Sequence, residues 1–70
     1  MKQAEVKIGM KVYKRAAGRN RYQLWTVDGI DELPLSTGQH HKWRLSRVER
    51  VDGEMKTFTT VAISASLSHE

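Results

Sequence analysis

Apolar and polar residues alternate strictly near the start of the chain. The apolar positions are Val6, Ile8, Met10 and Val12, and the residues between and after them are Lys7, Gly9, Lys11 and Tyr13. A period of two predicts a strand over residues 6–12 with one face in the core, so Tyr13 should point outward. Gly9, inside this run, predicts a bulge or a bend.

A second strand is expected over residues 22–30, which are rich in aromatic and β-branched side chains. Residues 16–21 form the predicted hairpin loop before it, because Gly18 and Asn20 both tolerate positive φ. Asp28-Gly29 is either a turn or a bulge within this strand. Residues 31–41 are predicted to be the main loop, since Pro34 removes a ladder donor and argues against a central strand.

Asp52-Gly53, between two extended runs, predicts a second hairpin. A two-residue loop would pair Glu49 with Lys56. A three-residue loop through Glu54 would instead place Val51 opposite Met55, Leu45 opposite Val61 and Trp43 opposite Ile63. We favour the second register because it collects more apolar contact. Residues 61–67 should finish the sheet as an edge strand.

A helix is the alternative for the first half of this hairpin. Ser36 or Thr37 would cap it, it would run through Val51, and Gly53 would end it, which resembles a short recognition helix. The apolar stripe of such a helix is thin, and the β-branched residues that follow favour strand. We therefore predict a strand.

Five short strands in 70 residues predict a single all-β domain over residues 1–70. We expect a small five-stranded antiparallel sheet, either strongly bent or closed as an SH3-like barrel. The opening Ile-Gly-Met-Lys-Val-Tyr resembles the first strand of SH3-like barrels of the Tudor and KOW types, over roughly the first thirty residues. The resemblance implies a fold and says little about activity.

Charge is unevenly distributed along the chain. The net charge is +4, yet residues 1–26 contain seven Lys and Arg side chains against Glu5 alone. An acidic stretch follows, with Asp28, Asp31 and Glu32, and residues 42–50 are basic again. Two basic blocks separated by an acidic loop predict a polarised surface that attracts polyanions.

Aromatic residues are interleaved with these cations, a combination typical of nucleic-acid binding, because rings stack on bases while Lys and Arg neutralise phosphates. Tyr13 is the best candidate for stacking, with Trp25 as a second ring, whereas Trp43 is expected in the core. The predicted contact residues are Lys11, Tyr13, Lys14, Arg15, Arg19, Arg21, Trp25, Lys42, Arg44 and Arg47.

The leading hypothesis is therefore a non-enzymatic, basic module that contacts DNA or RNA mainly through phosphates. A small inhibitor or adaptor that docks on a larger protein is the alternative, with either the basic loop or the acidic stretch as its contact. A homodimer through the edge strand at residues 61–67 is compatible with both.

No enzyme, cofactor or metal is expected. The chain has no cysteine, and no nucleophile elbow surrounds its serines. His40 and His41 are adjacent, so on extended backbone they point to opposite sides and cannot readily chelate one ion. We expect a cytoplasmic protein without membrane association, because apolar runs fall short of the roughly 20 residues that cross a bilayer and the N-terminus lacks the apolar core of a signal peptide.

Overall fold

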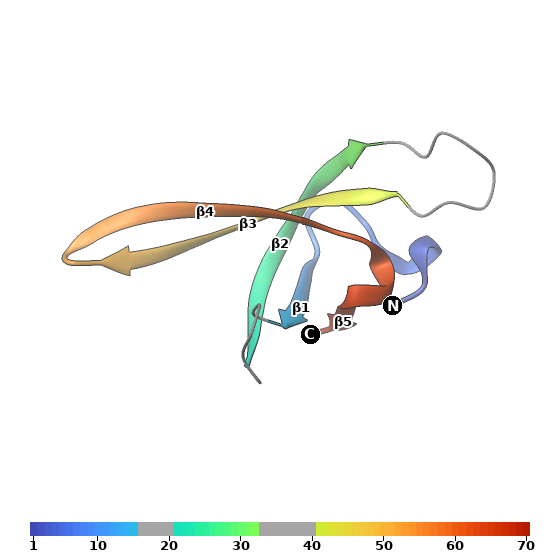
Figure 1. Cartoon of the computed structure of the whole chain (residues 1–70), viewed down its shortest axis with the longest axis horizontal. Coiled ribbons are helices and arrows are strands. Elements are labelled where there is room, and N and C mark those ends of the chain that lie inside the picture. The colour runs from blue at the N-terminus through green and yellow to red at the C-terminus, as the bar shows by residue number, and fades with distance from the viewer. Residues whose placement is uncertain (16–20, 33–40) are drawn as a thin grey trace.

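The computed structural model describes residues 1–15, 21–32 and 41–70, which form one antiparallel sheet in the order β4-β3-β2-β1-β5 (Figure 1). The strands are β1 (Lys11–Arg15), β2 (Tyr22–Glu32), β3 (Lys42–Val51), β4 (Glu54–Ala62) and β5 (Leu67–His69). Short 3-10 helices precede β1 (η1, Gln3–Glu5) and β5 (η2, Ser64–Ser66). The prediction of a small, bent, five-stranded antiparallel sheet is confirmed, and the sheet is open, with β4 and β5 as its outer strands.

The second hairpin adopts the two-residue loop, so the favoured three-residue register was wrong. Asp52 has φ 51° and Gly53 has φ 82°, and positive φ at both central residues is the requirement of a type I′ turn. Glu49 pairs with Lys56 as a result. The backbone geometry of the turn therefore outweighed the larger apolar overlap of the alternative. The helix alternative is also wrong, since residues 42–51 are strand β3.

The first strand begins later than predicted. β1 starts at Lys11, and residues 7–10 form a turn in which Met10 N–H donates to Lys7 O at 3.2 Å. Gly9 has φ 90°, which confirms a bend, and its N–H donates to Val27 O at 2.7 Å. This turn breaks the expected alternation, because Ile8 is 71% exposed.

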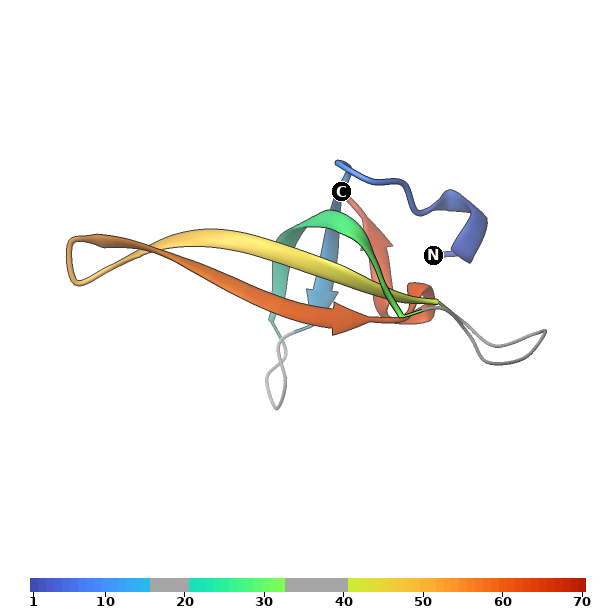
Figure 2. The ribbon, with the colours of Figure 1, turned by 90° about the horizontal axis from the view of Figure 1, so that it is seen from above.

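β2 extends through Glu32, beyond the predicted end at Ile30. Its register against β3 shifts between Val27 and Gly29 and again between Ile30 and Glu32, so Asp28-Gly29 belongs to a bulge rather than a turn. Bulges bend a strand and increase its twist, which fits the strong curvature of β2 in Figures 1 and 2. Residues 33–40 of the predicted loop, including Pro34, and residues 16–20 of the predicted loop 16–21 lie outside the described residues.

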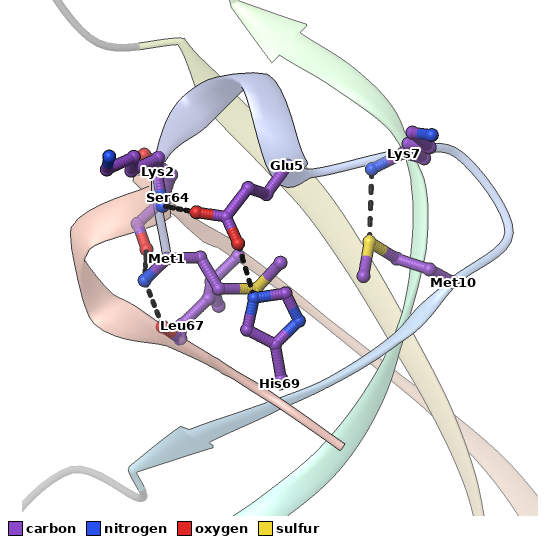
Figure 3. Close-up of polar contacts among 8 residues, drawn as sticks. All are labelled: Met1, Lys2, Glu5, Lys7, Met10, Ser64, Leu67 and His69. Carbon is purple, nitrogen blue, oxygen red and sulfur yellow. Dashed lines mark hydrogen bonds and ion pairs between the residues drawn. The ribbon is translucent and has the colours of Figure 1, made fainter.

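The core covers the inner, concave side of the curved sheet. Its buried side chains are Val6, Val12, Trp25, Val27, Trp43, Leu45, Ala62 and Leu67, with Met1 and Met10 packed against them. The N-terminal segment covers this side, where Met1 and Val6 pack with the core. Figure 3 shows the Met1 ammonium donating to the carbonyl oxygens of Ser64 and Leu67, at 3.1 and 2.7 Å.

Residues 61–67 are not the single edge strand that was predicted. β4 ends at Ala62, and η2 takes the chain across to β5 on the other side of the sheet. The buried Ser64 lies in this crossing. The alternation of small and apolar residues does not set the burial there, because Leu67 is buried whereas Val61 and Ala65 are exposed.

The β3–β4 hairpin projects from the body of the sheet. β2 pairs with β3 only as far as Ser46, so beyond that residue β3 and β4 form a two-stranded ribbon (Figures 1 and 2). This ribbon helps explain the elongated shape, whose principal extents are 45 × 22 × 20 Å. Within the part of the chain that the structure describes, no helix is long and apolar enough to cross a membrane.

Candidate nucleic-acid interface

Strand alternation divides the exposed side chains between two faces. Side chains that alternate with the core residues point to the convex side, which we call the outer face. Lys11, Thr26 and Ser46 form one row across β1, β2 and β3. The outer-face residues of the five strands are Lys11, Tyr13, Arg15, Tyr22, Leu24, Thr26, Lys42, Arg44, Ser46, Val48, Arg50, Met55, Thr57, Thr59, Val61 and Ser68, with Asp28 at the bulge.

The outer face is basic. Its cations are Lys11, Arg15, Arg44 and Arg50, over β1, residues 22–30 of β2 and residues 44–50 of β3. The one carboxylate of this face over the same residues is that of Asp28, at the bulge. Asp28 Oδ1 accepts a hydrogen bond from Ser46 Oγ at 3.0 Å. Strand spacing places the Lys11 and Arg44 Cα atoms roughly 12 Å apart.

The inner face of the ribbon has balanced charge instead. Arg47 and Lys56 are matched there by Glu49 and Glu54. The Nη1 atom of Arg47 donates to Glu49 Oε2 at 2.6 Å. The inner face of the ribbon is therefore neutral overall, whereas the outer face carries a net positive charge.

The two tryptophans both lie on the inner face. Trp43 is buried, which confirms its expected place in the core. Trp25 was predicted to stack on a base, but it is only 7% exposed and its ring lies 5.1 Å from the guanidinium carbon of Arg47. The same carbon lies 4.6 Å from the ring centroid of Phe58. Arg47 is thus held between two rings, and neither it nor Trp25 belongs to the outer face.

The other predicted contact residues lie at the edges of this surface. Lys42 is exposed at the start of β3, where its backbone pairs with Glu32. Arg21 is exposed immediately before β2. Lys14 points to the same side of β1 as Val12. Arg19 lies outside the described residues.

A shallow pocket lies between the two tyrosines of the outer face. Tyr13, Tyr22 and Ser68 line it, and its volume is about 350 Å³. Tyr13 pairs with Ser68 of β5 on one side, whereas Tyr22 is 61% exposed at the start of β2. Two aromatic rings thus border one open hollow.

A second pocket of about 350 Å³ adjoins the first and shares Tyr22 and Ser68 with it. Its lining also includes Lys14, Arg15, Ala65 and Ser66. The register explains why it opens there. Lys14 pairs with Leu67, the first residue of β5, so Arg15 extends beyond the strand toward η2. Cationic and hydroxyl groups meet at that point.

Sequence reasoning missed Tyr22, Ser66 and Ser68 as pocket residues. Tyr22 carried a signal, because an aromatic residue directly follows Arg21. The serines carried none, since their place beside β1 depends on pairing between residues more than fifty positions apart.

The described histidines make structural contacts. His41 donates its backbone N–H to Gln3 Oε1 at 2.6 Å, and its ring meets Trp43 edge-on with 6.0 Å between centroids. His69 Nε2 lies 2.5 Å from Glu5 Oε2 (Figure 3). The hydrogen bond with His69 and a second one from Lys2 N–H lower the pKa of Glu5 below its ordinary value. Among residues 1–15, 21–32 and 41–70, no group of three or more His, Cys, Asp and Glu side chains could hold a metal ion.

Comparison with protein-family models, curated proteins and solved structures found no significant match.

Proposed function

We propose that this protein is a non-enzymatic module that binds single-stranded nucleic acid on its outer face. The observation that supports the proposal best is the segregation of Lys11, Arg15, Arg44 and Arg50 onto one side of the sheet. Such a surface attracts a polyanion at long range and pairs with its phosphates at short range. A cytoplasmic location is part of the proposal, because a cysteine-free chain suits a reducing compartment.

The two tyrosines favour a single strand over a duplex. In a duplex the base faces are already stacked, whereas a single strand leaves them open to aromatic side chains. In this proposal one base occupies the hollow between Tyr13 and Tyr22. Its neighbouring phosphate lies in the adjoining pocket, beside Arg15, Ser66 and Ser68.

Salt dependence tests the phosphate contacts. With three to four contacts, affinity for a fluorescent single-stranded oligonucleotide should fall about 20- to 50-fold between about 50 and 200 mM salt. Fluorescence anisotropy measures this change. Absence of binding at the lower salt concentration would refute the proposal.

One pair of variants separates the two faces. Lys11→Gln and Lys56→Gln make the same chemical change and remove the same charge, but from the outer and the inner face respectively. Lys11→Gln should weaken binding and reduce the slope of log K against log salt by about 0.7. Lys56→Gln should leave both nearly unchanged. Equal effects of the two variants would mean that net charge, rather than this face, governs binding.

A base-free strand tests the stacking contact. Wild-type protein should bind an oligothymidine at least about fivefold more tightly than an abasic strand with the same number of phosphates. Tyr22→Leu should abolish that difference, and Tyr22→Phe should keep it because the ring remains. Equal binding of both strands by wild-type protein would contradict the proposed base site between the tyrosines. It would not contradict the proposed phosphate contacts.

Docking on a protein partner is the second candidate function. Two apolar side chains on the outer face of the ribbon favour it, because Met55 is 63% exposed and Val48 is 59% exposed. Affinity capture from nuclease-treated cell extract distinguishes the candidates. A protein retained by wild-type chain and lost with Val48→Ser would favour docking, whereas loss of all bound material after nuclease favours nucleic acid.

A further inference from the structure

β4 is an outer strand, and no strand in the described part of the chain pairs with its second backbone edge. In a two-residue hairpin the residues that flank the loop exchange both hydrogen bonds, and this pattern recurs at every second pair. Val51 with Glu54 begins the series, and Arg47 with Phe58 continues it. The intervening residues of β4 direct their N–H and C=O groups away from β3. They are Met55, Thr57, Thr59 and Val61.

Over residues 57–62 this edge lacks the features that usually protect an outer strand. Proteins guard such edges with charged residues, proline, bulges or shortness. The nine residues of β4 pair with β3 in unbroken register, and residues 57–62 contain neither charge nor proline. The opposite outer strand, β5, has only three residues. The exposed edge is therefore concentrated on β4.

We propose that β4 pairs antiparallel with β4 of a second copy of this chain, about a twofold axis at Phe58. Full overlap of the nine residues occurs in one register only, with Glu54 opposite Ala62 of the second copy. That register places each outward-directed residue opposite another, as antiparallel hydrogen bonding requires.

The side chains of β4 complement themselves in this register. On the outer face Met55 meets Val61 and Thr57 meets Thr59, which are apolar and hydroxyl pairs of the kinds that stabilise neighbouring strands. On the inner face Lys56 meets Thr60, so like charges are not opposed. A register shifted so that residue 56 lies on the axis would oppose two lysines. The side-chain pairs of β4 therefore favour the same register as the full overlap of its nine residues.

Pairing of this kind continues the sheet from one copy into the other. The twofold axis runs perpendicular to the sheet, so the outer faces of both copies lie on the same side, as in an isologous dimer. Arg44 and Arg50 of each copy would then contribute to one longer basic surface. The inference does not depend on nucleic-acid binding, because association is measured without ligand.

Light scattering at increasing protein concentration tests the association. The mass should rise from 8.0 kDa toward about twice that value. Thr57→Pro should keep the mass at that of the monomer, because proline removes an outward-directed donor and leaves the β3–β4 ladder intact. Thr57→Val, which keeps the donor, should still dimerise. A wild-type mass that stays at 8.0 kDa in millimolar solution would overturn the inference.

A disulfide tests the register, because the chain has no cysteine of its own. Phe58 faces its own copy in a non-hydrogen-bonded pair, where Cα atoms lie about 4.5 Å apart, within the range of a disulfide. Phe58→Cys should therefore form a covalent dimer on mild oxidation. Thr60→Cys, whose equivalents would lie roughly 13 Å apart along the strands, should not. Equal crosslinking of both variants would contradict this alignment.

Discussion

Replacing Arg47 should destabilise the fold rather than remove a nucleic-acid contact. The guanidinium carbon lies 5.1 Å from the centroid of Trp25 and 4.6 Å from that of Phe58. Only 20% of the Arg47 side chain is exposed, so it links the ribbon to the core. We expect Arg47→Ala to loosen this junction.

The magnitude follows from the interactions that the arginine side chain makes. Each cation–π interaction contributes about 0.5–1 kcal/mol at this partial exposure. The ion pair with Glu49, which is half exposed, adds at most about 1 kcal/mol. With the packing of the alkyl stem, Arg47→Ala should lower the free energy of unfolding by about 2 kcal/mol. In a domain of this size that is a decrease in Tm of about 8–16 °C.

Thermal denaturation followed by circular dichroism measures this change. Arg44→Ala is the matched control, because that arginine lies on the outer face and its loss should alter stability by less than about 0.5 kcal/mol. Arg47→Lys should fall between wild type and Arg47→Ala, since an ammonium keeps the charge but not the planar stacking. If Arg47→Ala melted with wild type and lost oligonucleotide binding, Arg47 would be a contact residue after all.

Three further substitutions test the account of the fold. Leu45→Ala, at a fully buried position, should lower the free energy of unfolding by about 2–5 kcal/mol in urea titrations, and a loss below about 1 kcal/mol would mean that the core is placed wrongly. Gly53→Ala should cost about 1–2 kcal/mol in thermal melts, because Gly53 has φ 82°, and an unchanged melt would contradict the type I′ turn. Because the pKa of Glu5 is lowered in the folded state, its contact with His69 stabilises the fold at pH values above the ordinary pKa of a glutamate. This stabilisation is lost as the pH falls through the lower pKa of the folded state. Glu5→Gln should therefore melt earlier than wild type near neutral pH and converge with it in acid, whereas a constant difference across pH would argue against the ionic contact.

The second hairpin was the most predictable part of the fold. The extended runs on both sides of Asp52-Gly53, together with that pair, predicted two strands and their turn, because both signals are local. The register was mistaken because apolar overlap was weighed above the positive φ that the turn requires. The φ values of Asp52 and Gly53 decide that question.

The first strand shows how a local turn overrides a pattern. Alternation placed Ile8 in the core, but Gly9 permits a backbone conformation that turns the chain before β1. Ile8 is left exposed as a result, while Val6 still reaches the core from outside the sheet. A period of two therefore located the buried residues correctly at the two ends of the run, Val6 and Val12, and not at Ile8 between them.

The candidate site was predictable in its charges and not in its shape. Alternation along β1 placed Lys11, Tyr13 and Arg15 on one face, and this needs no tertiary information. The two pockets depend on β5 pairing with β1, which brings together opposite ends of the sequence. Trp25 belongs to the core and Arg47 lies over its ring, and composition indicates neither contact.

Mapping of the bound surface by NMR tests the central claim most directly. Backbone amide shifts of ¹⁵N-labelled protein would be followed while an unlabelled single-stranded oligonucleotide is added at low salt. We expect changes concentrated around Lys11, Tyr13, Tyr22 and Arg44, with the amide of Lys56 unaffected. Changes centred on Lys56 and the inner face of the ribbon, or none at all, would contradict a nucleic-acid surface on the outer face.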